Sequence, residues 1–181
     1  MHFFQLKLKE IIHQHKSISV YTWSVFIHLI FVTFWIGGML FTAAVLVPAT
    51  RKKLSSQRGL LFTELGTRFS RLSWLIFPLL ILTGFTALIG RGFTVETIFS
   101  IDFWQTTYGS RLAGKLHLFG WVLALSGIHD FWLGPKAAQL MDQEPDSART
   151  QRFRKVTSWA GRINLLLGLG ILYYAVTLVR G

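Results

Sequence analysis

The amino-acid sequence predicts an all-α membrane protein, a polytopic bundle of four transmembrane helices. Of the 181 residues, 51% are hydrophobic and only 15% are charged, and the mean hydropathy is positive. A water-soluble domain of this size would carry far more polar surface. Four apolar runs are also long enough to cross a bilayer, which takes about 20 helical residues. No long Pro- or Ser-rich linker divides the chain, so we expect one transmembrane domain over residues 18–181.

Three prolines mark the predicted helices. The apolar runs cover about residues 20–47, 72–90, 112–133 and 160–179. Pro48 and Pro135 follow the first and third runs. They should end those helices, because proline lacks the backbone N–H and clashes with the preceding turn. Pro78 lies inside the second run and should kink it.

The N-terminal segment differs from the four runs. Residues 1–17, MHFFQLKLKEIIHQHKS, alternate apolar and basic side chains at roughly helical spacing. This pattern predicts an amphipathic helix in the membrane interface. The segment lacks the small-residue cleavage site of a secretory signal, so we expect it to be retained in the mature protein.

Lysines and arginines are distributed unevenly between the two ends of the predicted helices. Twelve of the 19 lie in the connections 51–71 and 135–162. By the positive-inside rule these connections are cytoplasmic, which places both termini in the periplasm of a bacterial cytoplasmic (inner) membrane. The basic residues flank apolar runs and form no continuous patch, and no nucleic-acid motif is present, so the lipid bilayer is the expected environment and nucleic acid is not an expected partner.

The two halves of the chain resemble each other. His28-Leu29 in the first run and His117-Leu118 in the third both precede a proline that follows the run. Ser73-Trp74 and Ser158-Trp159 occupy matching places in the second and fourth. The pattern predicts two parallel two-helix repeats, related by a pseudo-twofold axis along the membrane normal.

Three histidines lie inside the apolar runs. His28 and His117 fall roughly 12 Å and 8 Å from the outer ends of their helices at 1.5 Å per residue, so they are expected to face each other at similar depth. His129 lies close to the opposite end. Ionisable groups in a membrane are costly and tend to mark ligands or pathways. The alternative is that each histidine only hydrogen-bonds a neighbouring helix.

Two neutral imidazoles without any cysteine favour haem b. The absence of cysteine excludes thiolate metal sites, Fe–S clusters and covalent haem attachment. His28 and His117 would be the axial ligands of the iron. The other residues expected at this site are Trp35, Gly38 and Trp121 against the macrocycle and Arg91, Arg111 and Lys115 beside the propionates. Copper is the alternative, with Met39 on the His28 face, and His129 is a possible second metal site.

The sequence also resembles two related membrane families. "HLIFVTFWIGGMLFTAAVLVP" and "GKLHLFGWVLALSGIHDFWLGPKAAQL" are similar to segments of the copper-resistance protein CopD and of the HemJ-type protoporphyrinogen oxidases. The HemJ resemblance implies a haem b site with a first-helix histidine (His28) before Trp35 and Gly38. It also implies a lysine at the start of the third helix and a histidine at its end, here Lys115 and His129. The chain departs from HemJ proteins after Gly38 and in its fourth helix.

These observations together predict a haem b-binding membrane protein of the cytochrome b type that carries electrons. A redox protein or membrane complex is its expected partner, and a quinone is a further candidate. Whether the chain is an enzyme stays open; if it is one, we expect an oxidoreductase. The alternatives are a CopD-like copper-handling protein, a HemJ-like oxidase, and a cofactor-free subunit that anchors a larger complex.

The predicted orientation can be tested by cysteine labelling. The natural chain has no cysteine, so Ser56→Cys and Ser100→Cys each introduce one unique thiol. With the basic connections in the cytoplasm, a membrane-impermeant maleimide added to intact spheroplasts should label residue 100 and spare residue 56. Labelling of residue 56 alone would show that the topology is inverted.

Overall fold

The computed structural model describes residues 2–51, 57–144 and 147–180, and in this part of the chain it contains helices and no strand. Four helical segments are long and apolar enough to cross a membrane, which confirms the predicted all-α four-helix class: Ile18–Arg51, Gly59–Gly90, Thr107–Gln143 and Ala148–Val179. The elements in chain order are α1 (His2–Phe41), η1 (Thr42–Leu46), α2 (Val47–Arg51), α3 (Arg58–Gly90), α4 (Val95–Phe99), α5 (Ile101–Gln105), α6 (Thr107–Ile128), η3 (His129–Leu133), α7 (Gly134–Gln143) and α8 (Ala148–Arg180).

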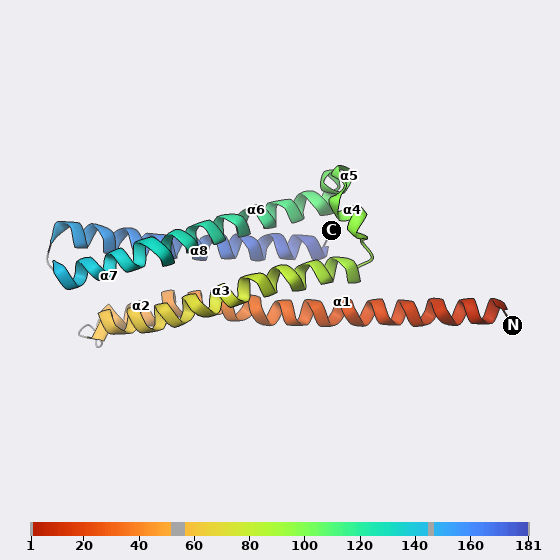
Figure 1. Ribbon diagram of the computed structural model, residues 1–181, viewed down its shortest axis with the longest axis horizontal. Helices are drawn as coiled ribbons and strands as arrows, with labels where there is room; N and C mark the ends of the chain where they lie inside the picture. The colour runs from red at the N-terminus through yellow and green to blue at the C-terminus, as the bar shows by residue number, and fades with distance from the viewer. Residues whose placement is uncertain (1, 52–56, 145–146, 181) are drawn as a thin grey trace.

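The four long segments form two antiparallel pairs. α1 packs along α3, and α6 packs along α8. The short helices α4 and α5 join the pairs at one end, and α2 and α7 lie at the other, as Figure 1 shows. We call these the α4–α5 end and the α2–α7 end. The pairing is the one that a repeated two-helix unit requires.

The N-terminal segment is part of the first long helix. α1 runs without interruption from His2 to Phe41, and its beginning extends past the rest of the bundle in Figure 1. The expected boundary near residue 17 is therefore not a break in the helix. Residue 1 lies outside the described residues, and the interfacial location of this segment stays a prediction.

The expectation that Pro48 and Pro135 end their helices is wrong. A π-helical segment precedes each proline, η1 before Pro48 and η3 before Pro135, and the chain continues as α2 and α7. A proline ring clashes with the carbonyl four residues earlier in an α-helix. In the wider π-helical turn that carbonyl is displaced, so the helix passes the proline. α3 likewise continues through Pro78 as one helix.

The two π-helical segments allow the two halves of the bundle to be aligned. Each ends two residues before its proline, so Pro48 and Pro135 are equivalent positions 87 residues apart. At this offset His28 corresponds to Lys115, and His117 corresponds to Ile30, which is exposed. The sequence comparison of His28 with His117 was therefore out of register by two residues.

Aromatic packing joins the two pairs in the middle of the bundle. The Phe77 side chain of α3 is almost fully buried. Its ring makes edge contacts with Trp35 of α1, Trp74 of its own helix and Phe119 of α6, at centroid distances of 5.6, 5.5 and 5.8 Å. Such contacts add to the free energy gained from burying the rings. Phe77 therefore holds both pairs against one core.

The α4–α5 end contains a tight turn into α6. Thr106 caps α6, its hydroxyl accepting a hydrogen bond of 3.0 Å from the Gly109 N–H. A Cβ atom at Gly109 would collide with the carbonyl group of Phe103 and the backbone of Trp104. Only glycine therefore fits between α5 and the first turn of α6.

Gly109→Ala should lower the free energy of unfolding in detergent by about 2–3 kcal/mol, because the added methyl group displaces buried backbone. Gly120→Ala in the same helix is the matched control, since a Cβ there meets nothing within 4 Å. It should cause no loss, with a gain of up to about 1 kcal/mol from helix propensity. Equal effects of the two substitutions in denaturant titrations would contradict the described turn.

Candidate functional site

Two polar clusters that contain a histidine lie in the described bundle. One surrounds Asp130 toward the α2–α7 end, and the other surrounds His28 toward the α4–α5 end. In each cluster, hydrogen bonds connect a histidine to polar side chains of its own helical segment or of a neighbouring helix.

The Asp130 cluster consists of Ser70, Trp74, His129 and Asp130. The Ser70 hydroxyl and the Trp74 indole N–H both donate to Asp130 Oδ2, at 2.6 and 3.0 Å. His129 Nδ1 lies 2.7 Å from Asp130 Oδ1. The side chain of Asp130 is 16% exposed and that of His129 is 35% exposed. The carboxylate is therefore covered by its donors, while part of the imidazole stays accessible.

These contacts determine which nitrogen of His129 carries the proton. An indole N–H can only donate, so Oδ2 accepts from Trp74 as well as from Ser70. A carboxyl group is ordinarily much more acidic than an imidazolium, so we assign Asp130 as a carboxylate whose Oδ1 accepts. His129 Nδ1 is then the donor in the third bond. In the neutral ring the Nε2 atom keeps its lone pair, so it is the atom available to a metal ion or a proton.

The backbone at this point is also irregular. His129 and Asp130 are the first two residues of η3. π-helical turns are rare and frequently occur at functional sites. Here the turn carries His129 and Asp130, which are hydrogen-bonded to each other, and Asp130 connects the turn to Ser70 and Trp74 of α3.

In the His28 cluster, too, the histidine Nδ1 is hydrogen-bonded to a side-chain oxygen. His28 Nδ1 lies 2.8 Å from Thr83 Oγ1, and this hydroxyl donates to the Leu79 carbonyl at 2.7 Å. Thr83 must therefore accept, and the His28 Nδ1–H donates, which leaves Nε2 with a lone pair. A Cβ at Gly84 would lie 3.5 Å from the ring. Lys115, which aligns with His28 in the second pair, is half-buried on α6.

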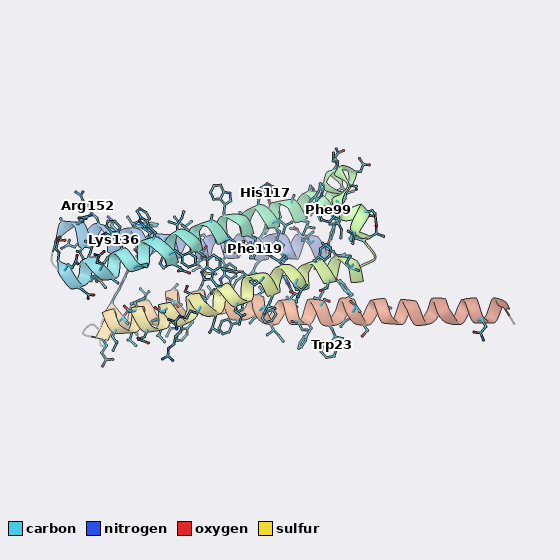
Figure 2. The ribbon with its side chains drawn as sticks, viewed as in Figure 1. Trp23, Phe99, His117, Phe119, Lys136 and Arg152 are labelled. Carbon is cyan, nitrogen blue, oxygen red and sulfur yellow. The ribbon has the colours of Figure 1, made fainter. Side chains whose placement is uncertain are left out.

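The structure does not bring His28 and His117 together. His117 lies on the exposed side of α6, where its Nδ1–H donates to the Ala113 carbonyl of its own helix at 2.7 Å. In Figure 2 it points away from α1 and α3, whereas Phe119 lies on the side of α6 toward α3. The reason is the two-residue difference in register, which turns His117 by about 200° relative to Lys115. The arrangement expected of two axial haem ligands is absent from this geometry.

The other residues expected around a haem have different roles. Trp35 is buried in the aromatic core, Gly38 packs under the Phe69 ring, and Trp121 is exposed. The two arginines expected beside the propionates have partners in the protein. Arg91 lies over the Tyr108 ring at 4.9 Å, and Arg111 donates to the Thr177 carbonyl at 2.8 Å.

Several polar residues of these clusters were not expected from the sequence. Trp74 and Thr83 lie in the second apolar run and Ser70 lies just before it. Trp74 was noted only for its match with Trp159, and nothing in the sequence marked these residues as partners of Asp130 or His28. Asp130 carried the available signal, since it is a carboxylate within a long apolar segment. Asn164 was also missed: its Nδ2 donates to Ser126 Oγ at 3.0 Å, while its Oδ1 is buried without a partner among the described residues.

Comparison with known proteins identifies relatives. A family model described as copper resistance protein D matches residues 63–178. An uncharacterized protein of Aquifex aeolicus (strain VF5) is 32% identical over 159 residues, which cover 86% of this chain and 93% of that protein. No solved structure matches. The family match includes the whole Asp130 cluster and excludes His28.

Asp130→Asn should move the proton of His129 from Nδ1 to Nε2. The amide oxygen must stay opposite Ser70 and Trp74, so the amide NH2 faces His129 Nδ1 and forces it to accept. Nitrogen-15 NMR of histidine-labelled protein in detergent, at alkaline pH, distinguishes the two tautomers, and the signal lost in His129→Ala identifies residue 129. Ser70→Ala is the control and should leave the tautomer unchanged. An Nε2–H tautomer in the unmodified protein would refute the described hydrogen bonding.

Proposed function

This chain belongs to the copper resistance protein D family, and from that membership we propose that it handles copper within the membrane, binding the ion as cargo along the four-helix bundle. Cargo ions must bind well enough to enter and weakly enough to leave. Neutral imidazole and thioether groups spaced along a bundle suit that requirement. Imidazole suits copper ions, and thioether sulfur selects Cu(I).

The observation that carries the proposal is the pairing of His129 with Asp130. A metal-binding histidine almost always donates its other ring N–H to a carboxylate, a carbonyl or water, which fixes the ring and raises its basicity. His129 has this arrangement, with a bond of 2.7 Å and an accessible ring. The nearby carboxylate also offers negative charge to a cation that would otherwise be expensive to place in hydrocarbon.

Two further donors lie along the same bundle. Met39 of α1 is half-buried against the core, and its terminal methyl lies 3.1 Å from a Cβ placed at Gly168 of α8. His28, whose Nε2 is also unprotonated, is eleven residues before Met39, or about 16 Å along the helix. We propose that copper passes between the α4–α5 end and the α2–α7 end by way of His28, Met39 and His129.

The positions of His28 and His117 favour copper over haem b. A haem held by His28 and His117 needs both rings on facing helix sides, and His117 is on the exposed side of α6. The prediction of electron transfer, with a redox protein or a quinone as partner, depended on that pair of ligands. It is therefore unsupported without them. We also propose that the protein lies in the bacterial cytoplasmic membrane with its α2–α7 end toward the cytoplasm, because the basic connections are at that end.

The proposal predicts that copper binding depends on His129 and not on His117. In the purified protein, competition with a chromogenic Cu(I) chelator should show at least tenfold weaker binding after His129→Ala. Asp130→Asn should weaken binding by about tenfold, the lower end of what removal of a carboxylate behind a metal-binding histidine costs. Reconstituted into vesicles, both variants should take up less copper than the unmodified protein.

His117→Ala is the matched control, since it is the same substitution in the same membrane-spanning segment, Thr107–Gln143, at an exposed position. It should change neither copper binding nor uptake. Loss of copper binding in His117→Ala but not in His129→Ala would overturn the assignment. The visible spectrum of the protein purified from haem-replete cells tests the rival function. Sharp bands on reduction, without copper binding, would favour the cytochrome.

A further inference from the structure

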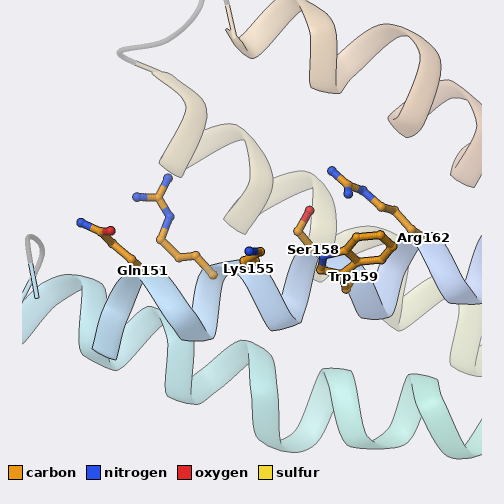
Figure 3. A pocket seen from close by; sticks show the side chains of 6 residues that line it. Gln151, Lys155, Ser158, Trp159 and Arg162 are labelled. Atoms are coloured by element: carbon orange, nitrogen blue, oxygen red, sulfur yellow. The ribbon is translucent and has the colours of Figure 1, made fainter. Parts of the chain in front are cut away.

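A basic pocket lies on α8 at the α2–α7 end, separate from both polar clusters. It has a volume of about 400 Å³ and is lined by Gln151, Arg154, Lys155, Ser158, Trp159 and Arg162. Their side chains project from one face of α8, as Figure 3 shows. Three cations, a hydroxyl and an amide thus meet in one hollow, which is the donor set that a phosphate group needs.

Within the part of the chain that the structure describes, no ion pair neutralises the positive charge of this pocket. Among the described residues, no carboxylate forms an ion pair with Arg154, Lys155 or Arg162. The Arg162 guanidinium instead lies over the Trp159 ring, 4.9 Å from its centroid. This contact fixes the arginine without cancelling its charge. Three uncompensated cations this close together repel one another, and a bound anion would relieve that repulsion.

An apolar groove adjoins the basic pocket. It has a volume of about 530 Å³, and Lys155 and Trp159 line both hollows. The rest of the groove is almost wholly apolar, formed by Leu125 and Leu133 on one side and by Val156, Ala160 and Ile163 of α8 on the other, with Arg152 at its edge. A ligand that fills both hollows must therefore carry an anionic group at one end and a hydrocarbon chain at the other.

The position along α8 agrees with such a ligand. The apolar part of this helix begins near residue 160, so Arg154 and Lys155 lie before it and Trp159 lies at the boundary. Tryptophan is enriched at that level of a membrane, where the headgroups meet the acyl chains. Basic pockets between transmembrane helices on the cytoplasmic side are suited to anionic headgroups.

We infer that α8 holds an anionic phospholipid, with its phosphate in the basic pocket and one acyl chain in the groove between α8 and the α6–η3 segment. Arg154, Lys155 and Arg162 bind the phosphate, and Ser158 donates a hydrogen bond to it. The groove distinguishes a lipid from free phosphate, because phosphate alone would leave the apolar hollow empty.

Native mass spectrometry of the full chain in detergent tests this site. The unmodified protein should retain phosphatidylglycerol in preference to phosphatidylethanolamine. Arg154→Gln/Lys155→Gln/Arg162→Gln should weaken phosphatidylglycerol binding at least tenfold. The matched control is Arg51→Gln/Arg68→Gln/Arg71→Gln, which removes the same charge from exposed positions outside the pocket. It should retain the lipid, and equal loss in both triple variants would overturn the site.

A second variant tests the groove independently. Val156 is 51% exposed and lines the groove but not the basic pocket, so Val156→Trp should fill the groove without disturbing the core. It should weaken phosphatidylglycerol binding several-fold. The thermal shift produced by inorganic phosphate should be small for both the unmodified protein and this variant. A phosphate shift as large as the lipid shift, together with unaltered lipid binding in Val156→Trp, would show that the pocket binds free phosphate and would overturn the lipid assignment.

Discussion

A carboxylate inside a membrane protein must find its hydrogen-bond donors within the protein, because hydrocarbon supplies none. Asp130 meets this requirement with donors from two helices, Ser70 and Trp74 of α3 and His129 of its own segment. The bonds cross between the α1–α3 pair and the α6–α8 pair, beside the contacts that Phe77 makes with Trp74 and Phe119. The need to satisfy one charge therefore determines how the two halves of the bundle meet and which ring nitrogen of His129 is available.

The helical fold was predictable because the number and length of the apolar runs can be read directly from the sequence. Apolar length gives the number of spans, and the resemblance between the two halves of the sequence suggested two two-helix units. The helix ends were not predictable in this way. Pro48 and Pro135 normally terminate helices, and the sequence carries no separate signal for the π-helical turns that let both helices continue.

The candidate site was predictable only in part, for a geometric reason. Depth along a helix follows from counting residues, but the direction of a side chain depends on register, and an error of two residues turns it through about 200°. His117 is only two residues from the position that aligns with His28, yet it lies on the exposed side of α6. His28 is half-buried, with its ring against Thr83, and its role stays a prediction. Ser70 and Trp74 reach Asp130 from 60 and 56 residues away, and a single sequence does not reveal contacts at such separations.

A π-helical turn is equivalent to an α-helix with one residue inserted. Both halves of this chain carry the insertion at the same distance before a proline. Two separate two-helix chains packed in this way would form a symmetric pair, with identical residues at the positions that His28 and Lys115 occupy. Because both units belong to one chain here, those positions can differ. An imidazole at one position and an ammonium group at the other give the bundle two unlike faces.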